Sequence, residues 1–268
     1  MNSRRRVAIR VSSAVALLLL ILLAAADGAS AQGYVAPDVV VFCEPTLQPV
    51  VTEIGALWRR KTGVPVRVFA SPTDLLLKQV AHGIRDDIVI AEGDATLAAA
   101  VQQRIIKAQT RSGGWRNRLV VARRGSNSAA GVLTRDSNLL TFADSGPIAI
   151  VDPPVATAGA QSRTALETLG LWAGLQGHSV GVVSTEDATF LLNGGKARLA
   201  VVYATDVAAD PALSVAATFP DDAYPPIVYW WAETRQARSA ETDNFADFLR
   251  QPETAARLRS AGLEISPQ

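Results

Sequence analysis

The sequence of 268 residues predicts an α/β chain with two lobes, each a mainly parallel sheet flanked by helices. Short runs rich in Val and Ile alternate with segments whose apolar residues recur at helical spacing, and this alternation occurs in two successive series. The segment "NRLVV" leaves the first series, and "PPIVYWWAE" returns to it near the C-terminus. Two extended crossings are therefore expected to form a hinge between the lobes.

The first series contains three strands, each followed by a helix. Val and Phe at 39–42 form an uninterrupted apolar run of strand length, and Gly63 and Gly83 are expected to end the first two helices. Ser71 or Thr73 is the expected N-cap of the second helix. The expected elements are strand 39–42, helix 46–58, strand 64–69, helix 71–83, strand 86–91 and helix 94–104.

The second series repeats this pattern after a strand at 117–125 and a polar, loop-like stretch at 125–138. "STEDATFLLNGG" is typical of a capped helix that ends on glycine. The chain closes with two strands that run back and two helices. The expected elements are strand 146–154, helix 158–172, strand 179–183, helix 184–195, strand 197–206, strands 214–220 and 225–233, and helices 239–251 and 252–262.

These elements predict the limits of the two lobes. Residues 36–118 and 227–265 are expected to form lobe 1, and residues 119–217 lobe 2. Residues 218–226 are expected to form the return crossing. Ligands of such folds bind at the carboxyl ends of the strands, between the lobes.

The N-terminus is typical of a secretory signal peptide. Arg4, Arg5, Arg6 and Arg10 precede a short apolar run at 14–26, and the small residues of "ASA" end at Ala31. We expect cleavage after Ala31 and a periplasmic mature protein. "SRRRVAI" fits either an ordinary positive n-region or a twin-arginine signal, so the export route stays open.

Charge and cysteine content argue against a nucleic-acid-binding protein and against a fold stabilised by disulfides. The chain has 26 basic and 25 acidic residues, and after residue 31 it has 22 and 24, so no basic surface for nucleic acid is expected. The single cysteine, Cys43, allows no internal disulfide.

The order of six segments resembles that of the periplasmic molybdate-binding proteins of ABC importers. The resemblance covers nearly all of the mature chain and is strongest at 148–229, where "DP", "AG", "LGLW", "VYATD" and "TFP" agree in spacing. The segments are "VFCEPTLQPVV", "TGVPVRVFASPTDLL", "DDIVIAEGD", "IAIVDPPVATAGAQSRTALETLGLW", "STEDATFLLNGGKARLAVVYATD" and "VAATFPDDAYPPIVY".

The resemblance implies a type II solute-binding fold that closes on a small oxyanion such as molybdate or tungstate. It also implies an ABC permease as partner, a monomer and no cofactor. The metal of a bound molybdate would be held through its oxygens, so no residue is expected as a direct metal ligand. Neutral hydroxyl and N–H groups would bind the anion. The implied contact residues are Thr46, Ser71 or Thr73, Ala158, Ala188 and Tyr203.

Some of these residues have a structural interpretation as well. Thr46 and Ser71 could be ordinary helix caps, and Tyr203 could be a buried tyrosine at the end of a strand. The sequence does not decide between Ser71 and Thr73 as the second hydroxyl.

The first strand–helix turn departs from the family, because Cys43, Glu44 and Pro45 stand where small residues are usual. A carboxylate near a divalent oxyanion repels it by roughly a few kcal/mol. Glu44 either pairs with a base such as Arg67 or faces the cleft, where it would favour a neutral or cationic ligand. Trp230 is a further possible determinant of specificity, because a tryptophan in the cleft would suit an organic ligand.

Three other functions are considered. His82 and His178 have no partner motif, and no nucleophile elbow, metal-spaced cluster or nucleotide loop is present, so we expect no enzyme. The signal peptide and the missing DNA-binding helices argue against a transcription regulator. A periplasmic partner of an enzyme system that has lost transport remains open.

Overall fold

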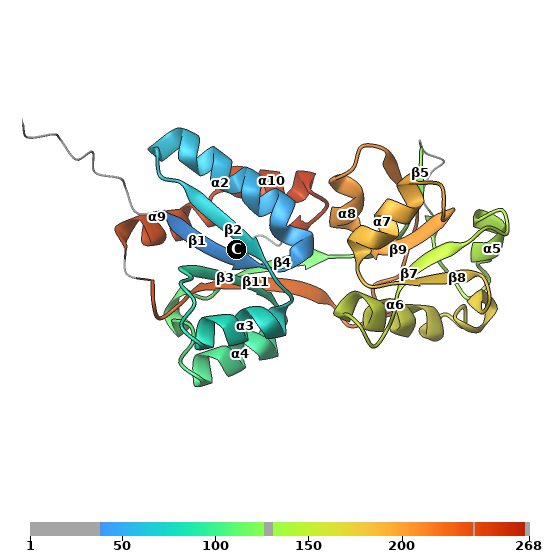
Figure 1. Cartoon of the computed structure of the whole chain (residues 1–268), viewed down its shortest axis with the longest axis horizontal. Coiled ribbons are helices and arrows are strands. Elements are labelled where there is room, and N and C mark those ends of the chain that lie inside the picture. The colour runs from blue at the N-terminus through green and yellow to red at the C-terminus, as the bar shows by residue number, and fades with distance from the viewer. Residues whose placement is uncertain (1–37, 126–130, 238, 266–268) are drawn as a thin grey trace, which may run out of the picture. The chain divides into compact units, whose positions relative to one another are not determined.

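The computed structural model describes residues 38–125, 131–237 and 239–265. These residues form an α/β fold with two six-stranded sheets, each covered by helices (Figure 1). The predicted signal peptide at 1–31 lies outside the described residues. Within the described ranges, no helix is both long enough and apolar enough to cross a membrane.

The first sheet draws its strands from both ends of this region. Its order is β12-β4-β11-β3-β1-β2. β1 pairs in parallel with β2 and β3, whereas β11 runs antiparallel between β3 and β4, so the sheet is mixed. Its strands are β1 (Val39–Cys43), β2 (Val66–Ala70), β3 (Ile88–Glu92), β4 (Ser112–Asn117), β11 (Ile227–Glu233) and β12 (Glu264–Ile265).

The second sheet is built from one continuous stretch of the sequence. Its order is β6-β10-β5-β9-β7-β8, with β7 parallel to β8 and β9, and β5 antiparallel to β9 and β10. Its strands are β5 (Leu119–Arg124), β6 (Gly131–Val132), β7 (Ile148–Val151), β8 (Ser179–Val182), β9 (Leu199–Tyr203) and β10 (Leu213–Thr218).

Helices cover both faces of the first sheet, with α2 and α10 on one side and α3 and α4 on the other (Figure 1). In the second sheet, α6 and α7 both pack on β7 and β9. The helices are α2 (Gln48–Thr62), α3 (Thr73–Ala81), α4 (Asp94–Gln102), α5 (Leu139–Phe142), α6 (Thr157–Thr168), α7 (Thr185–Asn193), α8 (Ala204–Ala208), α9 (Ala240–Leu249) and α10 (Pro252–Ser260), with short 3-10 turns η1 (Pro45–Leu47), η2 (Ala108–Thr110) and η3 (Ala173–Leu175).

Local sequence explains where several helices begin and end. Gly63 ends α2 in the left-handed region, with φ of 79°, as its position in the sequence predicts. Ser184 caps α7, because its hydroxyl accepts a hydrogen bond from the N–H of Asp187 at 3.1 Å. Pro72 rather than Ser71 or Thr73 is the N-cap of α3, so that expected cap is wrong. A proline fits there because an N-cap N–H needs no intrahelical partner.

The region near residue 118 departs from the expected single strand. Two strands are present, β4 in the first sheet and β5 in the second, and only Arg118 separates them. "SGGWRN" gives no apolar alternation, which is why sequence periodicity misses β4. The short helix α8 also follows β9 where only a turn is expected. The hydroxyl of Tyr224, in the return segment, accepts a hydrogen bond from the N–H of Leu119 at 3.0 Å and ties the two crossings together.

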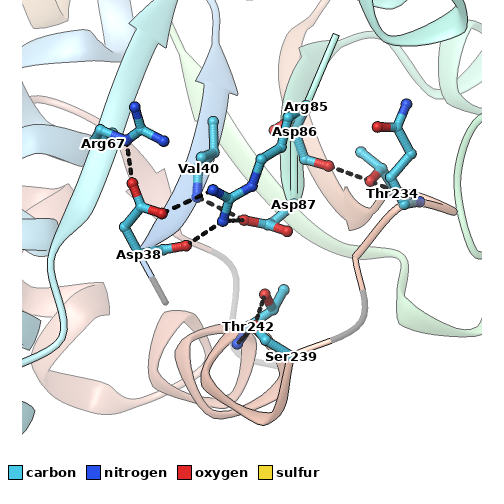
Figure 2. Close-up of polar contacts among 10 residues, drawn as sticks. Asp38, Val40, Arg67, Arg85, Asp86, Asp87, Thr234, Ser239 and Thr242 are labelled. Carbon is cyan, nitrogen blue, oxygen red and sulfur yellow. Dashed lines mark hydrogen bonds and ion pairs between the residues drawn. The ribbon is translucent and has the colours of Figure 1, made fainter. Parts of the chain in front are cut away.

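Charged residues gather at the amino edge of the first sheet, where the parallel strands begin (Figure 2). Asp38 forms ion pairs with Arg67 and Arg85, and the carboxylate of Asp87 accepts a hydrogen bond from the N–H of Val40 at 2.9 Å. Burial acts to raise the pKa of Asp38, but the hydrogen bonds and charges of Arg85 and Arg67 together outweigh it, so the pKa of this carboxyl lies below its usual value. The suggested pairing of Arg67 with Glu44 is therefore wrong, since Arg67 lies at the opposite edge from the turn after β1.

Candidate functional site

A cleft of about 510 Å³ lies at the carboxyl ends of β1, β3, β7, β8 and β9. Its walls come from both sheets, because the turns after these strands meet there, as the rule for open α/β sheets predicts. The lining residues are Glu44, Pro45, Thr46, Pro72, Asp74, Glu92, Pro153, Pro154, Val155, Ala156, Thr157, Ala158, Ala160, Val183, Ser184, Thr185, Tyr203 and Tyr229.

Glu44 lines this cleft directly after β1. One oxygen of its carboxyl, Oε1, accepts hydrogen bonds from both the N–H and the hydroxyl of Thr73, with the N–H at 2.6 Å. Burial raises the pKa of Glu44, the two bonds from Thr73 oppose this, and the charge of Asp74 adds to the rise. Thr73 therefore holds the carboxylate in place and stabilises its charged form.

Glu92 brings a second carboxyl to the same edge, at the end of β3. The N–H of Glu92 donates to the hydroxyl of Thr73 at 2.9 Å, so Thr73 bridges the two glutamates. Gln161 on α6 donates from Nε2 to Oε1 of Glu92 at 2.6 Å. Burial, with the nearby charge of Glu44, raises the pKa of Glu92 to about 7, and the bond from Gln161 opposes this.

Tyr203 continues this network on the side of the second sheet. Its hydroxyl donates to Oε1 of Gln161 at 2.8 Å, and its side chain is buried. The chain of bonds from Tyr203 through Gln161 to Glu92 joins the second sheet to the first. Burial raises the pKa of Tyr203 well above the usual value, so this hydroxyl stays a hydrogen-bond donor at neutral pH.

The second-sheet wall offers backbone donors. Helix α6 begins at Thr157 with Ala156 as N-cap, and no side chain caps it. Among the described residues, the N–H groups of Thr157 and Ala158 have no hydrogen-bond partner. Gly159 permits this turn to lie close to the end of β7, because a Cβ at residue 159 would stand 2.5 Å from the carbonyl oxygen of Asp152. Ser184 and Thr185 bring the start of α7 to the same wall.

Thr46 lines the cleft and bonds to residues of α8, the helix that follows β9. Its hydroxyl is hydrogen-bonded to the hydroxyl of Thr205 and donates to Oδ1 of Asp206 at 3.1 Å. Asp206 also accepts from the N–H of Tyr203 at 2.9 Å. Burial raises the pKa of Asp206 to about 6, with these hydrogen bonds acting against the rise.

The structure brings four of the expected contact residues to the site or its edge. Thr46, Ala158 and Tyr203 line the cleft, and Thr73 holds Glu44. Ser71 is buried and does not line the cleft, and its N–H donates to the carbonyl of Cys43 at 3.0 Å. Ala188 lies in the apolar core of the second sheet, one turn beyond the start of α7, and its N–H donates to the carbonyl of Ser184.

Two of the suggested specificity determinants lie outside the cleft. The thiol of Cys43 is fully buried, and burial raises its pKa strongly, so a reactive thiolate is disfavoured. Trp230 lies on β11, where the guanidinium of Arg111 sits 4.7 Å from its ring centre. Tyr229, one residue earlier, lines the cleft instead.

Sequence reasoning missed Glu92, Gln161 and Tyr229. A signal for Glu92 was present, since it ends the apolar run "DDIVIAE" as Glu44 follows "VVVFC". Residues at the carboxyl ends of neighbouring parallel strands meet at one edge. Gln161 is an unremarkable helical residue, and only the packing of α6 brings it to the site.

Hydrogen-bond donors and acceptors are distributed unequally around the cleft. Glu44, Asp74 and Glu92 supply carboxyl groups from the first sheet, whereas the second sheet supplies N–H groups and hydroxyls. No lysine, arginine or histidine is among the described residues that line it. The described part of the chain also contains no group of three or more His, Cys, Asp or Glu that could hold a metal ion. The arrangement is suited to binding a small polar solute.

Known proteins share both the sequence pattern and the fold. Residues 39–264 match the profile of the family described as bacterial extracellular solute-binding protein. The molybdate-binding protein ModA of Escherichia coli (strain K12) is 26% identical over 228 residues, which cover 85% of this chain and 89% of that protein.

Solved structures show the same two-lobed fold. The periplasmic molybdate-binding protein of Azotobacter vinelandii superposes with a TM-score of 0.71 at 19% identity, covering 86% of this chain and 100% of that chain. The tungstate-binding protein TupA of Desulfovibrio alaskensis G20 has a TM-score of 0.54 at 14% identity, covering 82% and 92%. The match over residues 39–264 spans both sheets and every wall of the cleft, and this chain therefore belongs to the family of bacterial extracellular solute-binding proteins.

Proposed function

We propose that this chain is a periplasmic solute-binding protein of an ABC importer, and that its solute is a small oxyanion. Molybdate and tungstate are the first candidates, because the relatives just described are named for these anions. The expected signal peptide, with cleavage after Ala31, supports a periplasmic location. An inner-membrane permease is the expected partner, and neither a cofactor nor catalytic activity is part of the proposal.

The observation that carries the proposal is the free start of α6. The N–H groups of Thr157 and Ala158 line the cleft without a partner among the described residues, and the helix dipole adds partial positive charge there. A hydroxyl at Thr185 and the start of α7 lie on the same wall. Donors of this kind bind an anion without a countercharge, because a poorly hydrated cleft strengthens each hydrogen bond.

The two sheets provide the moving parts. We propose that residues 36–118 with 227–265 act as one lobe and residues 119–217 as the other, with 218–226 as the return crossing. The bonds from Thr46 to Asp206 and from Gln161 to Glu92 join the two proposed lobes. An anion bound between the walls would favour the closed arrangement by adding contacts to both. A monomer suffices for this mechanism.

Calorimetric titration of the mature chain tests the proposal. Molybdate or tungstate should bind with one anion per chain, and sulfate is compared in the same buffer. Tyr203→Phe removes the hydroxyl that orients Gln161 and should weaken binding by about tenfold, corresponding to about 1.4 kcal/mol. Thr168→Val is the control, because the exposed hydroxyl of Thr168 at the far end of α6 donates to the carbonyl of Thr164 and does not line the cleft, and it should leave the affinity unchanged.

A neutral or cationic organic solute is the second candidate. The carboxyl groups of Glu44, Asp74 and Glu92 favour it, and Val155 and Val183 add exposed apolar surface on the opposite wall. If molybdate, tungstate and sulfate all fail to bind the dialysed protein at any pH between about 6 and 8.5, the oxyanion proposal falls and this candidate replaces it.

A further inference from the structure

The two walls of the cleft require different hydrogen-bonding groups on a ligand: the start of α6 requires acceptors, and the glutamate wall requires donors. The N–H groups of Thr157 and Ala158 need a hydrogen-bond acceptor. The carboxylates of Glu44 and Glu92, when ionised, accept hydrogen bonds only. A fully deprotonated tetrahedral oxyanion offers acceptors on every side, so it satisfies the α6 wall and repels the glutamate wall. One proton placed between a glutamate and the ligand removes this conflict.

Both glutamates have a free oxygen for such a contact. Thr73 donates twice to Oε1 of Glu44, and Gln161 donates to Oε1 of Glu92. The second oxygen of each carboxyl, Oε2, has no partner among the described residues, and neither is a fully buried atom. Each Oε2 is therefore available to a solute in the cleft.

We propose that Glu92 is a specificity-determining residue that makes binding proton-linked, so that the oxyanion is bound together with one proton held between the Glu92 carboxyl and a ligand oxygen. The inference rests on the proposed oxyanion function. The proton comes either from solvent, onto the Glu92 carboxylate, or from a ligand that already carries one. The site then selects ligands by their ability to share a proton, and Glu44 controls how readily Glu92 takes it up.

Geometry assigns the proton to Glu92 rather than to Glu44. Two donors from Thr73 converge on Glu44 and stabilise its charged form, whereas Glu92 has the single donor of Gln161. The charge of Glu44 also lies close enough to disfavour a second charge on Glu92. A pKa of about 7 for Glu92 agrees with this assignment.

Among the described residues that line the cleft, no basic side chain lies beside the pair to neutralise it. The only ion pair of Asp74 among the described residues is an exposed contact with Lys78 at 3.7 Å, and Lys78 does not line the cleft. Incoming negative charge will therefore raise the proton affinity of Glu92 further. Among the described residues, the other titratable groups that line the cleft or interact with the pair are Asp74 on α3, Tyr203 on β9, Tyr229 on β11 and the buried Cys43 at the end of β1. Asp206 on α8 accepts from the N–H of Tyr203 and does not line the cleft.

The test titrates the mature chain with molybdate from about pH 6 to about pH 8.5, in two buffers with different heats of ionisation. Above about pH 7 the affinity of the wild type should fall by about tenfold per pH unit, and binding should take up about one proton. Glu92→Gln keeps the oxygen that accepts from Gln161 and should give an affinity that is independent of pH, tighter than wild type at about pH 8.5 by more than about tenfold.

Two further variants separate a specific role from a general charge effect. Glu44→Gln removes the neighbouring charge, so the decline in affinity should begin at a lower pH while proton uptake persists. Glu53→Gln, an exposed carboxyl on α2 that does not line this cleft, should behave as wild type. Molybdate binding that is equal across the pH range, with no proton uptake, overturns the inference and leaves the proposed function standing. Absence of oxyanion binding at every pH overturns the proposed function, and the inference with it.

Discussion

Replacing Gly159 by alanine should disturb both the fold and the anion-binding wall. Gly159 lies in the first turn of α6, and a Cβ there would stand 2.5 Å from the carbonyl oxygen of Asp152 and 2.7 Å from that of Val151. Both contacts are to backbone, so no side chain can rotate away. The start of α6 must retreat by about 1 Å to restore ordinary contacts, at a typical cost of about 1–3 kcal/mol for overpacking.

Alanine is a better helix former than glycine by up to about 1 kcal/mol, which offsets part of this cost. We therefore expect Gly159→Ala to lower the free energy of unfolding by about 1–2 kcal/mol. For a domain of this size that corresponds to a fall in Tm of roughly 2–8 °C. Urea denaturation followed by tryptophan fluorescence measures the change. Molybdate affinity should also fall by about tenfold or more, because a displacement of about 1 Å misplaces the N–H groups of Thr157 and Ala158.

Gly174→Ala is the matched control, because a Cβ at Gly174 would meet no atom within 4 Å. Its effect on stability should stay within about 0.5 kcal/mol. A Gly159→Ala protein with the stability and molybdate affinity of wild type would refute the claim that close packing of α6 against β7 positions the binding wall.

Three other predictions follow from polar contacts. Thr73→Val leaves Oε1 of Glu44 and the N–H of Glu92 without their partner and should cost about 1–3 kcal/mol of stability, whereas Thr73→Ser should be close to wild type in the same urea assay. Lys107→Met breaks a pair at 2.8 Å with the buried Glu233 and should destabilise by about 3 kcal/mol, while Lys61→Met at the exposed pair with Glu253 should cost less than about 1 kcal/mol; similar losses would contradict the role of burial. The raised pKa of Glu92 means that the folded state favours the protonated carboxyl. The stability contributed by this protonated carboxyl is fully present below pH 4.5 and is lost as pH rises through about 7. Glu92→Gln should flatten the decline in Tm of the unliganded protein over that range, and an unchanged slope would contradict the assignment.

Much of the fold could be predicted because its signals are local. The buried runs of β1 and β3, the glycine that ends α2 and the serine cap of α7 each depend on a few neighbouring residues. Strand β4 could not be predicted, because "SGGWRN" has no apolar alternation. Its pairing with the neighbouring strands β11 and β12 holds it in the sheet. The expected mainly parallel sheets are both mixed. In the first sheet the returning strand β11 enters antiparallel between β3 and β4, and in the second sheet β5 runs antiparallel to β9 and β10.

The candidate site was predictable in place but not in detail. Strand ends locate the cleft and Glu44, whereas Tyr203 is expected there only from the family resemblance. The partner of Glu44 could not be predicted in this way. Thr73 lies at the start of α3, 29 residues away in the sequence, and Arg67 forms an ion pair with Asp38 instead. Gln161 becomes important only because the fold brings it within hydrogen-bonding distance of Glu92 at the end of β3, which no local pattern encodes.

The position of β11 in the middle of the first sheet has a consequence for folding. Strands β1, β2 and β3 come first in the chain, but they cannot join β4 until residues 227–233 are available. The second sheet, in contrast, is encoded without interruption between Leu119 and Thr218. We expect the second sheet to form before the first sheet, which is completed only when nearly the whole chain is available, with the edge of β3 open to misassociation or proteolysis in the interval.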